Sequence, residues 1–435
     1  MATKALIVTY YWPPAGGPGV QRWLQFVKHF KEFDVEPIVY IPENPHYPII
    51  DESFIAEVPT GIEIIKTKIK EPYGLAKLFS KRKTQTISSG VITSKKPSFI
   101  EKTMLYVRGN FFIPDARIGW VKPSVSFLKE YIDKNKIDVV ITTGPPHSLH
   151  LIGMELKAAI GVKWLADFRD PWTTIHYHKE LRLSKASEVK HIKLEKEVLT
   201  NADQIVVTSK TTKKEFAEIT NQPIAVITNG FAKTTLFVRE PDTNFTLVHV
   251  GSLLSERNPE VLWLAIKELV ARVVGFADDF KLKLVGTVSD DIIANFKAYG
   301  IEDYVEIVGY VSHTEAVQTQ YNAQLLLLVE MDRVETKAII PGKLFEYLAA
   351  QRPIVALGPE GSDIANILSE TKAGAFFGYG EGDSLEHFLK EQYVAFKAGQ
   401  LLVSSEGIEK YSRRELTREM AKVVKNLWQE AGSLA

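Results

Sequence analysis

The sequence contains no cysteine among its 435 residues, so disulfide bonds and thiolate metal sites are excluded. Lys plus Arg and Asp plus Glu are equal at 53 each, and this balance gives no overall attraction to nucleic acid or another polyanion. No apolar run approaches the ~20 residues that a membrane-spanning helix needs. The N-terminus enters a strand pattern at once, without a secretory leader. We therefore expect a cytoplasmic globular protein.

Two kinds of motif are also missing. The sequence has no H-E-x-x-H and no Asp-x-Asp, which predicts that no metal is required. The glycine segment "GGPG" at 16–19 is not G-x-G-x-x-G, and no acidic residue follows at the distance that a dinucleotide ribose requires. These absences oppose a nicotinamide dehydrogenase, and we expect no cofactor.

What the sequence does contain is a repeated alternation of apolar strands with amphipathic helices. The pattern runs through the first half and restarts at 245–253, after the turn-rich segment 239–244. Such alternation predicts doubly wound α/β domains, and the chain length favours two of them. We place the first domain at 1–235 and the second at 236–410. A charged amphipathic helix at 411–435 follows the last strand.

In this architecture ligands bind beyond the carboxyl ends of the strands, where several charged residues are expected. "DFRDPW" (167–172) brings Asp170 to such an end, although an Asp–Arg pair that merely holds the loop would give the same pattern. "TTGPPHSLH" (142–150) brings His147 to another, with a helix-capping histidine as the alternative. Neither pattern decides between these interpretations.

Three helix starts in the sequence are candidate anion sites. Arg257 precedes one in "GSLLSERNPEVL", and Lys343 lies in the first turn of "PGKLFEYLAAQRPIVAL", where the helix dipole disfavours a cation. An exposed arginine and a solvated lysine are the plain alternatives. The third start follows "GGPG", whose glycines are equally explained by a tight turn. Glu346 also needs a reason, because it stands between Phe345 and Tyr347 in an apolar helix.

Taken together, these segments resemble the retaining GT-B glycosyltransferases, most closely the bacterial surface-polysaccharide enzymes of glycosyltransferase family 4. The resemblance covers nearly the whole chain and rests on five segments. They are "PPAGG" after the first strand, "DFRDPW", "ITNGF" (227–231), "VGSLLSERN" and "PGKLFEYLAAQRPIVALG". It implies two Rossmann-like domains facing across a cleft, with the C-terminal helix returning to the first domain.

The resemblance also implies roles for particular residues. The C-terminal domain would hold a nucleotide-sugar donor and the N-terminal domain the acceptor. Glu346 matches the second glutamate of the family's Glu-x7-Glu motif, which accepts hydrogen bonds from the donor ribose, and Arg257 matches a basic residue against the diphosphate. The first motif glutamate is replaced by Ala338, with Glu335 nearby, and an arginine usual in the family is Ser252. The donor-binding residues implied are Gly16, Gly17, Ser252, Arg257, Gly342, Lys343, Leu344 and Glu346.

The function predicted is retaining, metal-independent transfer of a sugar from a nucleotide diphosphate to a glycan or lipid-linked acceptor, in cell-surface polysaccharide synthesis. Arg257, Asp170 and His147 are the candidate catalytic residues, the last two on the acceptor side. A nucleotide-sugar 2-epimerase-like enzyme and a non-catalytic sugar-nucleotide-binding protein are the alternatives.

One segment departs from the α/β pattern. Residues 66–108 carry eleven Lys or Arg and two acidic residues, which indicates a basic insertion in the first domain. Either this segment is a solvated loop, or its charged side chains contact the anionic inner face of the cell membrane. Four apolar side chains of the segment would then insert shallowly into the membrane, namely Leu78, Phe79, Phe99 and Ile100.

Overall fold

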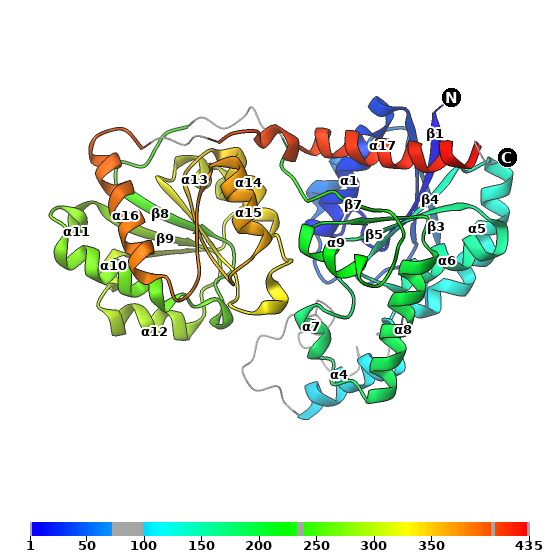
Figure 1. The fold of residues 1–435 in the computed structure, drawn as a ribbon, viewed down its shortest axis with the longest axis horizontal. Coiled ribbons are helices and arrows are strands. Elements are labelled where there is room, and N and C mark those ends of the chain that lie inside the picture. Colours follow the sequence, from blue (N-terminus) through cyan, green and yellow to red (C-terminus); the bar gives the residue numbers. More distant parts are fainter. Residues whose placement is uncertain (1, 72–98, 233–238, 402–404, 433–435) are drawn as a thin grey trace. The chain divides into compact units, whose positions relative to one another are not determined.

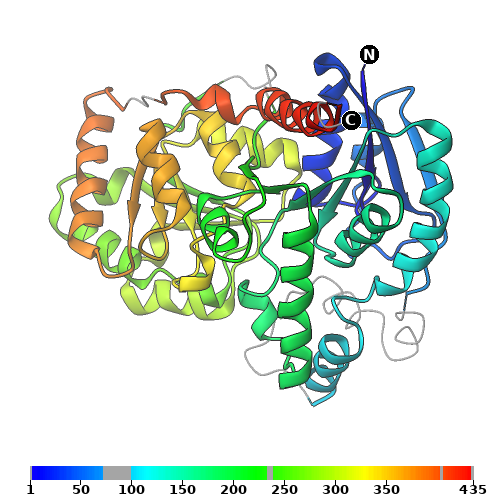
Figure 2. The same ribbon diagram turned by 45° about the vertical axis from the view of Figure 1, so that its right-hand side comes forward.

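A computed structural model describes residues 2–71, 99–232, 239–401 and 405–432. The chain forms two compact units, each an α/β layer structure (Figures 1 and 2). Unit 1 contains residues 1–229 and 413–435, and unit 2 contains residues 230–412. The sequence placed the corresponding divisions at 235 and 410.

Unit 1 is built on a parallel sheet of seven strands in the order β3-β2-β1-β4-β5-β6-β7. The strand order reverses between β1 and β4, which makes this the topological switch point of the unit. The strands are β1 (Thr3–Val8), β2 (Val35–Pro42), β3 (Glu63–Thr67), β4 (Val139–Gly144), β5 (Lys163–Phe168), β6 (Gln204–Val207) and β7 (Ile224–Val226).

Helices cover both faces of this sheet because successive strand residues point to opposite sides and both sides are apolar. In β1, Leu6 and Val8 belong to the core under α5 and α6, whereas Ala5 and Ile7 belong to the core under α1 and α17. The helices are α1 (Pro18–Phe30), α4 (Phe99–Phe111), α5 (Val121–Asn135), α6 (Ser148–Ile160), α7 (His176–Lys179), α8 (Lys185–Asn201), α9 (Lys210–Ala217) and α17 (Arg413–Gly432).

The C-terminal helix α17 belongs to the first unit, as the family resemblance implied. Its apolar side, which includes Met420 and Val424, is buried in the core that α1 also covers. Arg414 at its start pairs with Glu32, with Nε 2.7 Å from Oε2. Figure 1 shows α17 next to α1, so two segments far apart in the sequence cover the same face of the sheet.

Unit 2 repeats the architecture with six parallel strands in the order β10-β9-β8-β11-β12-β13, and its switch point lies between β8 and β11. The strands are β8 (Phe245–Val250), β9 (Phe280–Val285), β10 (Val305–Gly309), β11 (Leu325–Val329), β12 (Ile354–Leu357) and β13 (Gly374–Phe377). The helices are α10 (Glu260–Arg272), α11 (Phe276–Asp279), α12 (Asp290–Tyr299), α13 (His313–Asn322), α14 (Gly342–Ala350), α15 (Asp363–Thr371) and α16 (Gly382–Lys397).

The two Rossmann-like units confirm the predicted fold class. Most of the predicted basic insertion, including Leu78, Phe79 and the cluster at 81–83, lies outside the described residues. Its last part is α4, which the sequence did not predict as a helix. Within the described ranges, every helix is too short or too polar to cross a bilayer.

Candidate functional site

Unit 2 gathers charged side chains at its switch point, where β8 and β11 end side by side. Gly251 follows β8 with a φ of 112°, a value that glycine adopts without strain. A Cβ atom there would lie 2.9 Å from Nζ of Lys343. Gly251 therefore gives the chain its turn and leaves room for an ammonium group.

Arg257 and Glu330 form an ion pair at this switch point. Nη2 of Arg257 lies 3.4 Å from Oε2 of Glu330, whose side chain is only 2% exposed. Burial raises the pKa of Glu330, while the charge of Arg257 opposes that rise. Nε of Arg257 is buried and makes no hydrogen bond within the described part of the chain. The guanidinium thus retains an unused donor.

Lys343 stands in the first turn of α14 and reaches the same place. Its Nζ lies 3.5 Å from Nε2 of the buried His249 on β8. Burial and the neighbouring Arg257 lower the pKa of Lys343 to about 8, against the opposing effects of Glu330 and Glu346. Two cations held together where a helix begins attract an anion.

Glu346 lies one turn further along α14 and is half-buried. Its Oε2 accepts a hydrogen bond from Nε2 of Gln320 on α13, at 3.1 Å. On either side of it, Phe345 and Tyr347 are buried, and the Tyr347 hydroxyl accepts from the backbone N–H of Val250 at 2.9 Å. This bond ties α14 to the end of β8, so the helix presents its charged residues from a fixed position.

The other residues of unit 2 that were expected to bind a donor differ in how exposed their side chains are. Ser252 is exposed on the loop after β8, and a Cβ at Gly342 would meet open space. Leu344 is fully buried in the core of unit 2, so its side chain is not available to a ligand. Ala338 is buried as well, and Glu335 is half-buried in a short 3-10 turn.

Gly16 and Gly17 belong to unit 1, in the loop before α1. The N–H of Gly16 already donates to the carbonyl of Ile49 at 3.0 Å. Gly17 has a φ of 100° and begins the helix, so its conformation alone explains the glycine. Gly19 is different, because a Cβ there would collide with the guanidinium of Arg169.

Asp167 of "DFRDPW" is a structural carboxylate. It is fully buried with Arg22, and Nη2 of Arg22 lies 2.9 Å from Oδ1. Its Oδ2 accepts from Nε1 of Trp23 and from the hydroxyl of Thr143, each at 2.8 Å. Nη1 of Arg22 donates to the carbonyl of Thr228 at 2.7 Å. Asp167 thus holds α1, β4 and β5 together, and its partner is Arg22 rather than the adjacent Arg169.

Asp170, three residues later, lies at the carboxyl end of the sheet and is half-buried. Burial raises its pKa, although Arg169 opposes the rise, and the hydroxyl of Tyr177 donates to Oδ2 at 3.5 Å. The loop is held from α8, where Glu195 accepts from the backbone N–H groups of Trp172 and Thr173. Asp170 therefore has a fixed backbone and a carboxyl group with few partners.

His147 precedes α6, and its ring stacks on Trp172 with centroids 4.8 Å apart and planes 2° apart. Both of its ring nitrogens are buried and make no hydrogen bond to the described residues. Burial holds its pKa well below the ordinary value, so the ring is neutral. It does not accept a helix-capping hydrogen bond, and no side-chain cap is present at this helix start.

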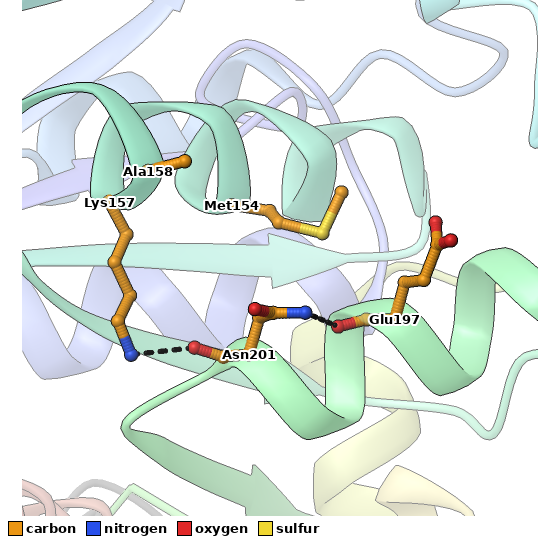
Figure 3. Close-up of a pocket in the computed structure, with 5 residues that line it drawn as sticks. All are labelled: Met154, Lys157, Ala158, Glu197 and Asn201. Carbon is orange, nitrogen blue, oxygen red and sulfur yellow. Dashed lines mark hydrogen bonds between the residues drawn. The ribbon is translucent and has the colours of Figure 1, made fainter.

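A hollow of about 370 Å³ lies elsewhere in unit 1, between the ends of α6 and α8 (Figure 3). It is lined by Met154, Lys157, Ala158, Glu197 and Asn201, and Nζ of Lys157 donates to the carbonyl of Asn201 at 2.7 Å. Both helices begin near the carboxyl ends of the strands and end near the amino ends. The hollow therefore belongs to the opposite edge from Asp170 and is not the candidate site.

Two family models match the chain, one in each half. The model of glycosyltransferase family 4 matches residues 83–233, and the model of glycosyl transferases group 1 matches residues 244–390. The second match contains the whole charged cluster at the β8–β11 switch point. Each half of the chain thus carries a glycosyltransferase family domain. No curated protein matches the sequence.

Solved structures share the fold of this glycosyltransferase over nearly its full length. A glycosyltransferase from Rickettsia africae is 14% identical, with a TM-score of 0.63 and coverage of 98% of both chains. The lipopolysaccharide outer core galactosyltransferase WaaB is 15% identical, with a TM-score of 0.58, covering 97% of this chain and 99% of its own. Anabaena HepE, solved in complex with UDP-glucose, is 12% identical, with a TM-score of 0.54 and 99% coverage of both.

Two residues of the unit 2 cluster were not predicted from the sequence. Glu330 directly follows the strand "LLLLV", and the same strand-end argument that singled out Asp170 would have found it. His249 gave a weaker signal, as one of two polar residues in a buried strand that is otherwise apolar. The sequence could not show that either one lies against Arg257 or Lys343.

Proposed function

We propose that this glycosyltransferase transfers a sugar from a nucleotide diphosphate to a glycan or lipid-linked acceptor in cell-surface polysaccharide synthesis, with retention and without a metal. The observation that carries the proposal is the cationic pair Arg257 and Lys343 at the β8–β11 switch point. Their charges are only partly compensated by Glu330, and Arg257 retains an unused buried donor. A diphosphate matches this charge and geometry.

The chemistry follows from where charge develops. As the bond between the anomeric carbon and the diphosphate oxygen breaks, the leaving group gains negative charge. Arg257 and Lys343 stabilise that charge in a partly buried place, where electrostatic effects exceed those in water. Glu346 accepts from the donor's ribose hydroxyls, and its present partner Gln320 keeps the carboxylate in position.

On the acceptor side, Asp170 binds the hydroxyl that attacks the anomeric carbon. The raised pKa of Asp170 makes its carboxylate a better proton acceptor than an exposed aspartate. His147 is neutral, and because both of its ring nitrogens are buried, it supports the neighbouring loop by stacking on Trp172 and does not touch the acceptor. The acceptor oxygen gains the sugar, and its proton leaves to a carboxylate or to the departing phosphate.

The first test is a panel of nucleoside diphosphates measured by thermal shift and calorimetry, because a ligand of the folded state raises its melting temperature. We expect the diphosphate of one base to bind wild-type protein, and Glu346→Gln to weaken that binding by about 1.5–3 kcal/mol. Glu306→Gln on the exposed edge strand β10 is the matched control. Unchanged affinity in a folded Glu346→Gln variant would contradict the ribose contact.

Product analysis then separates transfer from its alternatives. A transferase forms a new glycoside only when acceptor is added, and it forms that product in EDTA as well. A 2-epimerase converts the nucleotide sugar without acceptor, and a binding protein leaves the donor intact even over long incubation. An absolute requirement for a divalent metal would contradict the proposed stabilisation of the diphosphate.

A membrane contact on unit 1 completes the proposal and places the enzyme at the inner face of the cell membrane. One face of α8 presents Lys185, Val189, Ile192 and Lys196 at helical spacing, and the side chains of Val189 and Ile192 are 65% and 51% exposed. Phe111 of the neighbouring α4 is 73% exposed.

Charge favours an anionic lipid surface as the occupant of this face. Lysines 185, 190, 193 and 196 of α8 are exposed, against two carboxylates with exposed side chains, Glu188 and Glu197, of which Glu197 pairs with Lys193. Each cation near anionic headgroups contributes up to about 1 kcal/mol, and shallow apolar insertion adds to it. α4 lies against the start of α8, where the N–H of Ser184 donates to Oδ1 of Asn110 at 2.8 Å (Figure 2).

The contact is tested by sedimentation with liposomes. Wild-type protein should sediment with vesicles that contain anionic lipid. It should be released from them at ~0.5 M salt, because the Debye length is then only about 4 Å and the charges are screened. Val189→Glu with Ile192→Glu should abolish the binding, and so should Lys81, Arg82 and Lys83 changed to Glu if the basic segment contributes. The control is Val394→Glu on α16, another exposed valine. Binding that survives in the α8 variant would refute this face.

A further inference from the structure

His249 is a buried polar residue in the middle of an apolar strand. Its side chain is fully shielded from solvent, and all other residues of β8 but Thr246 are apolar. A buried imidazole without partners destabilises a fold, so both ring nitrogens call for hydrogen bonds. The structure supplies the carbonyl of Leu327 and Nζ of Lys343, and the backbone of Ser252 also interacts with the ring.

These partners determine which nitrogen carries the proton. Nδ1 lies 3.0 Å from the carbonyl oxygen of Leu327, which can only accept, so Nδ1 is the donor. Burial and the charge of Lys343 hold the pKa of His249 well below its ordinary value, so the ring is neutral. Nε2 is therefore an acceptor, and it faces Nζ of Lys343 at 3.5 Å.

Few other groups around Lys343 can act as a hydrogen-bond acceptor or counter-charge for its ammonium group. Arg257 is a cation and repels it, Glu330 is already paired with Arg257, and Glu346 is paired with Gln320. Gly251 provides space but no side chain. His249 is the neutral acceptor at the strand end, and it directs the ammonium without cancelling its charge.

We propose that His249 is a positioning residue, which holds the Lys343 ammonium at the carboxyl end of β8 so that it meets the donor diphosphate. The inference rests on the proposed function, because it assumes that a nucleotide diphosphate binds at Lys343. An aspartate or glutamate in place of His249 would hold the lysine more tightly but would neutralise it. A neutral acceptor keeps the net positive charge that the anion requires.

Two substitutions of His249 each keep one of the two hydrogen-bonding groups of the imidazole and remove the other. An asparagine amide ends near the position of Nδ1, so His249→Asn keeps a donor for Leu327 and removes the acceptor for Lys343. A glutamine amide reaches the position of Nε2, so His249→Gln keeps an acceptor for Lys343 and gives up the donor to Leu327. If His249 is purely structural, the asparagine variant should keep more of the nucleotide affinity. If His249 positions Lys343, the glutamine variant should keep more of it.

The experiment measures the affinity of the full chain for the nucleoside diphosphate that binds wild-type protein, between pH 7 and 9.5. We expect His249→Asn to weaken binding about tenfold and to move the alkaline loss of affinity to lower pH, because the ammonium loses its acceptor. His249→Gln should stay within about threefold of wild type and keep the wild-type pH profile. Melting temperatures of both variants show how much stability each has lost.

Three results have distinct meanings. If wild-type protein binds no nucleoside diphosphate, the proposed function fails, and this inference with it. If wild-type protein binds but His249→Asn keeps more affinity than His249→Gln, the positioning role is refuted and the proposed function stands. If both variants bind equally poorly with an unchanged pH profile, His249 supports only the fold, and the inference is likewise overturned.

Discussion

Replacing Asp167 with asparagine is expected to destabilise unit 1 by about 3–5 kcal/mol, the usual cost of breaking a buried ion pair from one side. The change leaves the fully buried guanidinium of Arg22 without its counter-charge. An amide also presents one acceptor where Trp23, Thr143 and Arg22 all donate. The melting temperature of unit 1, measured by calorimetry, should fall by about 10 °C.

The matched control is Asp170→Asn in the same motif. Burial already raises the pKa of Asp170, so an uncharged amide costs little stability there. We expect this variant to melt near the wild-type temperature and to lose acceptor-dependent product formation. If Asp170→Asn unfolded as readily as Asp167→Asn, or if Asp167→Asn kept wild-type stability, the division of the motif into one structural and one acceptor-side carboxylate would be wrong.

This pair of carboxylates shows what a sequence motif can and cannot predict. "DFRDPW" identified a strand end with two acids and an arginine, and the strand end is where the structure has it. The motif did not reveal that Asp167 bonds Arg22, because that partner lies 145 residues earlier in the chain. Local pattern locates a loop at the edge of a sheet, but only the packing of distant helices assigns each side chain its partner.

The fold was more predictable than the site, for a related reason. Buried parallel strands such as "LLLLV" are continuous apolar runs, so their number and alternation with helices can be read directly. Edge strands are harder, since β3 and β7 are only partly buried and carry weaker patterns. The helix α4 was missed because it adjoins a charged segment with little periodicity.

The sequence singled out Arg257 and Lys343 separately, Arg257 by the family resemblance and Lys343 by its place in the first turn of a helix, and the structure has both at one switch point. The resemblance also named Leu344, whose side chain proves to be in the core, and Gly16, whose N–H is already bonded to Ile49. Positions inherited from a motif include residues that the fold requires as well as residues that a ligand would touch. Burial and hydrogen bonding separate the two kinds.

Lys343→Met is expected to lower kcat for sugar transfer by about 10²–10³, the usual effect of removing one group that stabilises developing negative charge. Methionine keeps the length and apolar stem of lysine, so the helix start should remain intact. Lys390→Met, an exposed lysine of α16, makes the same charge change away from the cluster and is the control. The melting temperature of each variant shows whether the fold is kept.

The pH dependence of nucleotide affinity identifies the lysine as the responsible group. The ordinary lysine pKa is about 10.4, whereas burial and Arg257 lower the pKa of Lys343 to about 8. Below pH 8 the ammonium is charged and binds the diphosphate at no protonation cost. Above pH 8 binding must take up a proton, so the affinity of wild-type protein should fall by up to tenfold per pH unit.

In Lys343→Met this alkaline loss of affinity should disappear, because no titrating ammonium remains, while the affinity at pH 7 is already reduced. Arg257 stays charged throughout the range and cannot produce the same profile. Isothermal titration of the diphosphate at pH 7, 8 and 9 in both proteins is sufficient to decide. An alkaline loss that persists unchanged in Lys343→Met would show that another group titrates, and that Lys343 does not contact the leaving group.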